Sequence, residues 1–169
     1  MRVLVVEDEA DMRKLVTRYV EMLGYQHVTA ENGVKALDLA RKFPIDVVLS
    51  DVEMPEMDGI TFVTRFKQIA PFVPVVMLSG QREIAVVLTC IRAGALDFVE
   101  KERVVEDLEI TLRKAIAVRQ RELALRTVRE NAGAVRNLVD ELKTTLGAPT
   151  AQQAELLTRL DRLFELMKS

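Results

Sequence analysis

The chain has 169 residues, 49% of them apolar and 30% charged, enough for one ordinary domain with a packed core and some additional chain. Its 24 basic and 26 acidic residues give a formal net charge of -2, which excludes the overall basic charge typical of nucleic-acid-binding proteins. The single cysteine, Cys90, excludes an intramolecular disulfide and a cysteine-based zinc cluster, and we expect it to be a buried packing residue.

The N-terminal sequence reaches Glu7 and Asp8 after a few apolar residues, which is too early for a secretory signal peptide. No apolar run approaches the roughly 20 residues that a membrane-spanning helix needs. Together with the single cysteine, this pattern predicts a soluble, cytoplasmic protein without membrane contact.

From residue 2 to about residue 100, short runs of valine, isoleucine and leucine alternate with longer segments of helical periodicity. This alternation is typical of strand-helix units around a parallel sheet that is covered on both faces. Strands are predicted at Val3–Val6, Gln26–Ala30, Asp46–Ser50, Val75–Leu78 and Asp97–Val99. Helices are predicted at about residues 10–22, 33–42, 59–69 and 82–93, with glycine and proline at their boundaries. The predicted fold is therefore α/β, with a doubly wound five-stranded parallel sheet in three layers.

Polar residues stand at the ends of four predicted strands. In chain order they are Glu7-Asp8-Glu9, Asp51, Ser79-Gly80 and Glu100-Lys101. Ligands of an open α/β sheet bind outside the carboxyl ends of its strands, so we expect these groups to meet at one edge.

Such a set of groups suits the transfer of a phosphoryl group to a carboxylate. Both reactants are anionic, so the reaction needs a divalent cation and a counter-charge for the phosphoryl oxygens. Asp8, with Glu7 beside it, and Asp51 can hold Mg²⁺, and Asp51 would be the nucleophile that forms an acyl phosphate. Lys101 would neutralise one phosphoryl oxygen, and the Ser79 hydroxyl would donate to another.

Four motifs, in order and at matching spacing, make residues 1 to about 103 resemble the receiver domain of response regulators. They are Val-Val-Glu-Asp at 5–8, Val-Leu-Ser-Asp-Val-Glu-Met-Pro-Glu-Met-Asp-Gly at 48–59, Met-Leu-Ser-Gly at 77–80 and Ala-Gly-Ala-Leu-Asp-Phe-Val-Glu-Lys at 93–101. The resemblance implies a flavodoxin-like sheet with strand order 2-1-3-4-5. It also implies a bacterial two-component phosphorelay, in which a sensor histidine kinase or phosphotransfer protein is the donor to Asp51.

The resemblance further implies a role for each site residue. Glu7, Asp8 and Asp51 would bind Mg²⁺ through their side chains, and Glu53 through its backbone carbonyl. Ser79 and Phe98 would form a switch pair: the hydroxyl moves toward the phosphoryl group while the ring turns inward. This change would remodel the face made by helix four, strand five and helix five.

Two further positions refine this expectation. Family members usually follow the lysine with a proline, often through a cis peptide, whereas Lys101 precedes Glu102 here. We therefore expect a trans peptide or a re-routed loop, since a cis bond without proline costs about 3 kcal/mol. His27 is the only histidine and is expected to be structural, so the phosphoryl donor must be another protein.

After Val104, the only helix breakers are Gly133, Gly147 and Pro149. Leu108, Leu112 and Ala115 are expected to pack as helix five on a receiver domain of residues 1–117. A coiled-coil-like seam then covers residues 118–146, with apolar residues at alternating spacings of three and four and one polar exception, Arg121. Its members are Val118, Arg121, Leu125, Val128, Ala132, Val135, Val139, Leu142 and Leu146.

A single helix from 104 to 146 would be about 60 Å long, so we expect it to project from the domain. Gly133, beside Asn131, could instead break it in two. Gly147-Ala-Pro predicts a stop, and Thr150-Ala-Gln-Gln predicts a capping box that begins a final helix over 150–167. That helix carries an apolar stripe of Leu156, Leu157, Leu160, Leu163, Phe164 and Met167.

The helical extension, residues 118–169, leaves several outputs open. Our leading hypothesis is a homodimer through this region, with an unknown downstream protein target. The alternatives are an intramolecular helical hairpin, or a linker to a DNA-binding or enzymatic effector domain beyond Ser169 in a longer protein. A DNA-binding role for the extension itself is disfavoured by its near-neutral charge.

An enzyme of the haloacid-dehalogenase type also uses an aspartyl nucleophile. Those phosphohydrolases carry it after their first strand, with a second aspartate two residues on and a cap domain. Here Asp51 follows the third predicted strand, Glu53 stands at that offset, and no cap is predicted. We therefore expect no enzymatic activity beyond phosphoryl acceptance and slow autodephosphorylation.

Overall fold

The computed structural model describes residues 1–80, 83–145 and 150–166. Its strands are β1 (Arg2–Val6), β2 (Gln26–Ala30), β3 (Val47–Asp51), β4 (Val75–Ser79) and β5 (Asp97–Glu100). Its helices are α1 (Ala10–Met22), α2 (Gly33–Lys42), α3 (Gly59–Ile69), α4 (Ile84–Ala93), α5 (Val104–Thr145) and α6 (Ala151–Leu166), with a 3₁₀ turn at Lys101–Arg103 before α5.

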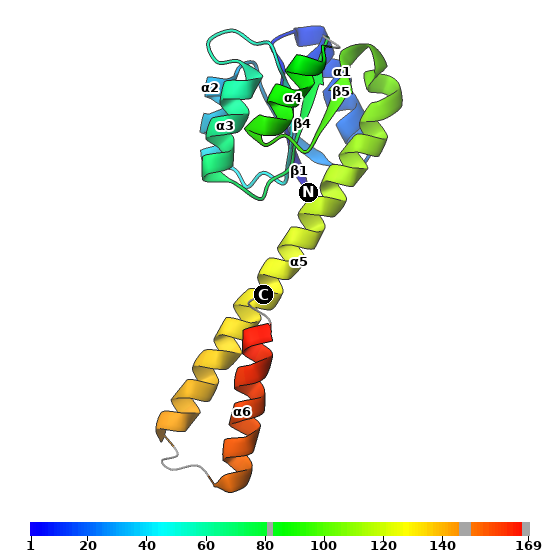
Figure 1. Ribbon diagram of the computed structural model, residues 1–169. Coiled ribbons are helices and arrows are strands. Elements are labelled where there is room, and N and C mark those ends of the chain that lie inside the picture. The colour runs from blue at the N-terminus through cyan, green and yellow to red at the C-terminus, as the bar shows by residue number, and fades with distance from the viewer. Residues whose placement is uncertain (81–82, 146–149, 167–169) are drawn as a thin grey trace. The chain divides into compact units, whose positions relative to one another are not determined.

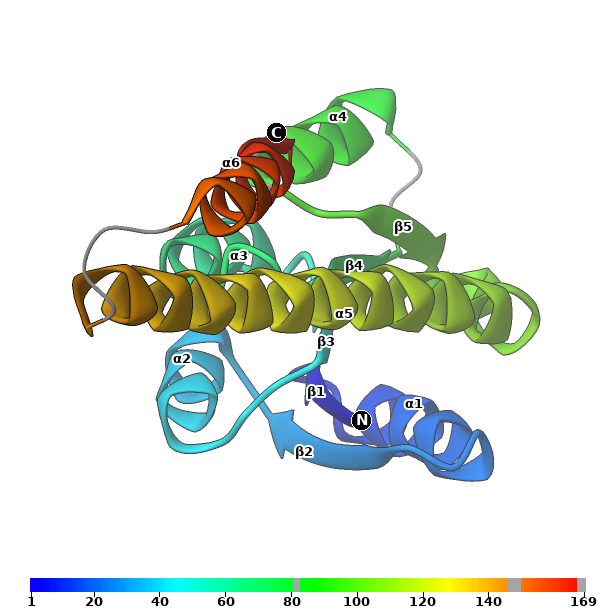
Figure 2. The same ribbon diagram turned by 90° about the horizontal axis from the view of Figure 1, so that it is seen from below.

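All five strands are parallel and lie in the order β2-β1-β3-β4-β5, which Figure 2 shows from one end of the sheet. The predicted α/β fold and strand order are thus confirmed. The predicted third strand was one residue too early, because β3 runs from Val47 to Asp51. Asp46 lies just before it, and its carboxylate accepts a hydrogen bond from the Arg2 backbone N–H at 2.9 Å.

Alternation along the strands sends side chains into two separate cores. Leu4 and Val6 of β1 face α2, α3 and α4, where Phe62 and Phe66 are the largest fully buried side chains. Val3 and Val5 face α1 and the first part of α5. Figure 1 shows these helices on the two sides of the sheet. The predicted packing of helix five is confirmed, since its three stripe residues are fully buried: Leu108, Leu112 and Ala115.

The chain divides into two compact units, Met1–Gln120 and Arg121–Ser169. The C-terminal unit contains the end of α5 and all of α6. The helix α5 continues through Gly133, so the suggested break at this residue does not occur. The predicted capping box is present: the Thr150 backbone N–H donates to Gln153 Oε1 at 2.9 Å, and the Gln153 N–H donates to Thr150 Oγ1 at 3.4 Å.

Within the C-terminal unit, α6 lies beside the last turns of α5 as a helical hairpin (Figure 1). The Lys143 ammonium is 3.3 Å from the Asp161 carboxylate, and Val139 is buried. Other seam residues are exposed, among them Leu125 at 42% and Val128 at 51%. Some predicted features lie outside the described residues or side chains: Leu142, Leu146, the Gly147-Ala-Pro stop, Leu163, Phe164 and Met167. Within the described chain, no helix is both long and apolar enough to cross a membrane.

Candidate functional site

The candidate site lies at the carboxyl edge of the sheet, where strand register aligns the predicted groups. Val6 of β1 pairs with Ser50 of β3, so Glu7 and Asp51 follow side by side. In β3 and β4, Asp51 pairs with Leu78, which places Ser79 one residue further along the edge. Asp51 and Ser79 are therefore the last residues of their strands, and their backbones are fixed by the sheet.

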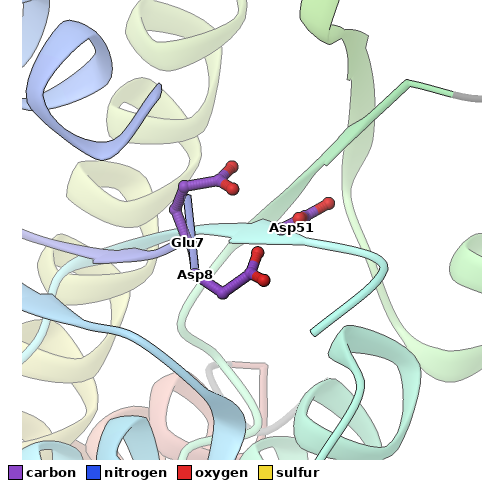
Figure 3. A group of neighbouring side chains, drawn as sticks. All are labelled: Glu7, Asp8 and Asp51. Carbon is purple, nitrogen blue, oxygen red and sulfur yellow. The ribbon is translucent and has the colours of Figure 1, made fainter. Parts of the chain in front are cut away.

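Three carboxylates gather at this edge. Glu7, Asp8 and Asp51 each offer an oxygen, and these atoms all lie within 4.8 Å of one another (Figure 3). Glu7 is fully buried and Asp51 is 4% exposed, whereas Asp8 is exposed. Mg²⁺ prefers one or two carboxylates together with water and substrate oxygens. This mixture of buried and exposed carboxylates fits such an ion and leaves it an open side.

Lys101 places an ammonium among these acids. Its Nζ lies 2.7 Å from Asp51 Oδ2 and 2.9 Å from each carboxylate oxygen of Glu7. The geometry of a hydrogen bond is met only at Glu7 Oε1, so Oε2 is buried without a hydrogen-bond partner among the described residues. A buried oxygen of this kind is normally satisfied, and a bound cation would satisfy it here.

The close packing of these groups shifts their proton affinities. Burial raises the pKa of the Glu7 carboxyl from 4.5 to about 7, against the opposing hydrogen bond from Lys101, and the charge of Asp51 adds to the rise. Burial alone would lower the pKa of the Lys101 ammonium, but hydrogen bonds to Asp51 and Glu7 outweigh it and raise that pKa. Lys101 is therefore charged at neutral pH, and Glu7 exchanges a proton near neutrality.

The backbone after Asp51 folds tightly around it. The Glu53 N–H donates to Asp51 Oδ1 at 3.3 Å, and the Gly59 N–H donates to the Val52 carbonyl at 2.8 Å. A Cβ on Gly59 would lie only 1.9 Å from the Asp51 carbonyl oxygen, so this position has no room for any other residue. The sequence predicted Gly59 only as a helix boundary, although it ends the motif that contains Asp51.

A second residue that sequence reasoning missed is Arg13, in the second turn of α1. Its guanidinium donates to the backbone carbonyls of Glu7 at 2.6 Å and Asp8 at 3.1 Å. The arginine thereby fixes the turn that carries two of the three acids. Its spacing of six residues from Glu7 is a weak signal, because a single arginine on a helix is most often a solvent-exposed residue.

The predicted switch residues lie on neighbouring strands. Ser79 is 2% exposed at the end of β4, and Phe98 is half-buried on β5 against the core of α2, α3 and α4. The ladder pairs Ser79 with Glu100 and Met77 with Phe98. The peptide between Lys101 and Glu102 is trans, as expected, and the chain continues through a 3₁₀ turn into α5.

The two remaining candidates lie away from these acids. His27 pairs with Val3, four residues before Glu7, and its imidazole is 3.6 Å from the Glu21 carboxylate. Cys90 is buried, as predicted, and burial raises the pKa of its thiol, which makes it a poor nucleophile.

Comparisons with known proteins agree with this arrangement. Residues 3–113 match the response regulator receiver domain family. The chain is 37% identical over 116 residues to the chemotaxis protein CheY of Bacillus subtilis, covering 66% of this chain and 97% of CheY. It is 30% identical over 162 residues to the DNA-binding transcriptional regulator NtrC of Escherichia coli, covering 95% of this chain and 33% of NtrC.

A solved structure gives the same result. Chemotaxis protein CheY4 of Vibrio cholerae superimposes with a TM-score of 0.65 at 32% identity, over 68% of this chain and 97% of CheY4. The chain spans 27% of another curated relative, the regulatory protein AtoC of Escherichia coli, so several relatives are much longer. The matched region contains the acidic edge and all five strands, and the chain belongs to the response regulator receiver domain family.

Proposed function

We propose that this receiver domain accepts a phosphoryl group on Asp51 from a sensor histidine kinase or a phosphotransfer protein. One observation carries the proposal. A nearly buried carboxylate at the end of the central strand lies 2.7 Å from the Lys101 ammonium and beside two further acids, Glu7 and Asp8. A cytoplasmic location, expected from the sequence, belongs to the same proposal.

The acids fit a magnesium ion. Glu7, Asp8 and Asp51 would hold it through their side chains, and Glu53 through its backbone carbonyl. Glu7 Oε2 supports this assignment: it lies 2.9 Å from the Lys101 ammonium but accepts no hydrogen bond from the described residues, so it keeps a lone pair for a metal ion. When bound, Mg²⁺ would screen the repulsion between the attacking carboxylate and the phosphoryl oxygens.

The protein's own groups would then position and stabilise the transfer. An Asp51 oxygen forms the new bond to phosphorus, while the bond from phosphorus to the donor's imidazole nitrogen breaks and leaves its electron pair on nitrogen. Lys101 neutralises charge on a phosphoryl oxygen, and the Ser79 hydroxyl donates to another. We assign no further catalysis to the chain beyond slow hydrolysis of the acyl phosphate.

Phosphorylation would act through Ser79 and Phe98. The ring of Phe98 is half-buried, and it would turn further inward when the Ser79 hydroxyl moves toward the phosphoryl group. Such a switch shifts the population between two packed states, and the new phosphoryl contacts supply the energy difference. The face around β5 would report the change.

Incubation with acetyl phosphate and magnesium tests the acceptor. The expected result is a mass gain of one phosphoryl group, which disappears in Asp51→Asn and persists in Asp38→Asn. Asp38 is a matched control because it is an exposed aspartate paired with Arg41 on α2. No mass gain on the wild-type chain would contradict the proposal, and rapid multiple turnover would favour a phosphohydrolase instead.

The output would run through a homodimer of the helical unit. Its hairpin leaves a row of apolar side chains on α5 largely exposed: Leu125 at 42%, Val128 at 51%, Val135 at 46% and Leu138 at 59%. Leu156 on α6 is exposed by 55%. A second copy would bury this surface. Three of its residues, Leu125, Val128 and Val135, belong to the predicted seam, which has the spacing of three and four residues that helix pairing requires.

Light scattering on the full chain tests the dimer. We expect twice the monomer mass for the wild type and the monomer mass for Val128→Glu combined with Val135→Glu. Met22→Glu is the control, because Met22 is 79% exposed at the end of α1. A monomeric wild type would contradict the dimer.

A second candidate is that the helical unit joins the receiver domain to an effector domain in a longer regulator. The alignment with NtrC favours it, because its 162 residues extend into the helical unit. An immunoblot of native cells decides between the two. A band well above the 19.1 kDa of this chain would support the longer regulator, and a band at that mass would contradict it.

A further inference from the structure

The loop that follows Asp51, residues 52–58, is attached to the start of α2. The side chain of Asn32, only 2% exposed, donates from Nδ2 to Glu56 Oε1 at 2.9 Å. Next to it, the Gly33 N–H donates to the Met57 carbonyl at 3.3 Å. Asn32 and Gly33, at the start of α2, thus bind the adjacent loop residues Glu56 and Met57.

Both the oxygen and the nitrogen of the Asn32 side-chain amide form hydrogen bonds. Its Oδ1 accepts from the Lys35 N–H at 2.9 Å and caps α2, which turns Nδ2 toward Glu56. A carboxylate can only accept hydrogen bonds, so Glu56 suits this donor. Capping alone would need only an acceptor oxygen, which aspartate or serine also supplies. The contact with Glu56 depends instead on the amide nitrogen, Nδ2, which donates the hydrogen bond.

The loop needs this support because its backbone is strained. Glu56 has a φ of +63°, in the left-handed region that residues with a side chain rarely adopt. Gly33 also approaches the loop closely, since a Cβ on it would lie 2.8 Å from the Met57 side chain and 2.9 Å from its carbonyl oxygen. The left-handed conformation of Glu56 is thus held by contacts at Glu56 itself and at the next residue, Met57.

The two ends of this loop contact Asp51. At one end the Glu53 N–H donates to the Asp51 carboxylate, and at the other Gly59 packs against the Asp51 carbonyl. We infer that Asn32 and Glu56 are positioning residues for the phosphoacceptor, and that their hydrogen bond holds the loop so that Glu53 and Asp51 present their oxygens to Mg²⁺. This inference rests on the proposed function of Asp51.

Exchanging the two polar groups tests the contact. Asn32→Asp keeps an oxygen for the α2 cap but sets two carboxylates against each other. We expect its Mg²⁺ affinity, measured by NMR titration, and its rate of labelling by acetyl phosphate each to fall about fivefold, the effect of one lost hydrogen bond. Adding Glu56→Gln returns a donor on the opposite side, so the double variant should recover most of both losses.

Two single variants complete the set. Glu56→Gln alone should behave like the wild type, because its side-chain carbonyl still accepts from Asn32. Glu56→Ala, at an exposed position, should reproduce the loss and serves if Asn32→Asp fails to fold. Urea unfolding of each variant separates this role from a purely structural one, which would lower stability while leaving the Mg²⁺ affinity of the folded chain unchanged.

The outcomes are distinguishable from those for the proposed function. A wild-type chain that binds no Mg²⁺ and takes no phosphoryl group overturns both claims. A wild-type chain that does both, with Asn32→Asp and Glu56→Ala equal to it, overturns only the positioning role. A double variant no better than Asn32→Asp alone also overturns it, because the pairing would then not matter.

Discussion

The ammonium of Lys101 lies 2.7 Å from the carboxylate of Asp51, although the two residues are 50 positions apart. Asp51 ends β3 and Lys101 directly follows β5. The strand β4 lies between β3 and β5 in the sheet, so the lysine side chain reaches past the end of a strand. The same ammonium also binds Glu7 at 2.9 Å. One cation therefore neutralises two acids that would otherwise repel each other.

This shared cation predicts opposite effects on metal binding and on phosphoryl transfer. Replacing it in Lys101→Gln removes a positive charge close to the acids, so Mg²⁺ should bind about tenfold more tightly. Labelling by acetyl phosphate should slow about a hundredfold, because the phosphoryl oxygens lose their counter-charge. Lys114→Gln is the matched control, since its ammonium pairs with Asp97 at 2.7 Å outside the site. Weaker Mg²⁺ binding by Lys101→Gln would contradict this account.

The raised pKa of Glu7 predicts that stability depends on pH. The folded chain binds this proton more tightly than the unfolded chain, so without metal the free energy of unfolding should fall as the pH rises from about 4.5 to about 7. A difference of this size corresponds to at most roughly 3 kcal/mol. Urea unfolding at pH 5 and pH 8 with a chelator measures it, and Glu7→Gln should remove this part of the dependence.

The affinity for Mg²⁺ should depend on the same Glu7 proton, but it should rise with pH where the stability of the metal-free chain falls. Because a carboxylate must lose its proton to bind a metal, Mg²⁺ affinity should rise with pH until about 7 and then level off. The Glu7→Gln variant should bind Mg²⁺ more weakly and with little pH dependence over that range. An affinity in the wild type that is constant from pH 5.5 to pH 8 would show that Glu7 is not a ligand.

The convergence of the acids was predictable because parallel strands end at one edge of a sheet. The strand ends at Glu7, Asp51 and Ser79 could be recognised from buried runs that stop at polar residues. The register between neighbouring strands then places these residues close together. The third strand was predicted one residue too early because no local pattern separates Asp46 from the strand. In the structure its carboxylate accepts from the Arg2 backbone N–H, 44 positions away, just before β3 begins.

Other features depend on contacts between segments remote in sequence and could not be predicted. The hydrogen bond from Asn32 to Glu56 joins residues 24 positions apart, and no local pattern pairs them. The unsatisfied oxygen of Glu7 depends on the angle at which Lys101 approaches it. In the C-terminal unit, the periodicity of α5 identified an apolar stripe but not its partner, because α6 and a second copy would satisfy the same spacing.

The close approach of Gly59 to Asp51 predicts a severe effect from one added methyl group. In Gly59→Ala the Cβ would lie 1.9 Å from the Asp51 carbonyl oxygen, and a backbone atom cannot move aside as a side chain can. We expect a loss of about 3 kcal/mol or more in the free energy of unfolding, together with weaker Mg²⁺ binding. Gly80→Ala is the control, because a Cβ there meets nothing within 4 Å. Equal stability of the two variants would refute the steric argument.

Two glycines, one inside a helix and one at a helix end, should respond to the same substitution with opposite changes in stability. Gly133 lies inside α5, where a Cβ would meet nothing within 4 Å. Gly133→Ala should therefore stabilise the C-terminal unit by about 1 kcal/mol, because alanine loses less backbone entropy in a helix. Gly94 caps α4 with a φ of +105°, and a Cβ there would also press on Lys67 at 3.2 Å.

Gly94→Ala should accordingly destabilise the receiver unit by about 1 kcal/mol or more. Urea unfolding followed by circular dichroism measures both variants against the wild type. If Gly133→Ala lowered stability instead, the helix would have to be bent or closely packed at that residue, and the continuous α5 would be wrong. The comparison thus tests the long helix independently of any phosphoryl chemistry.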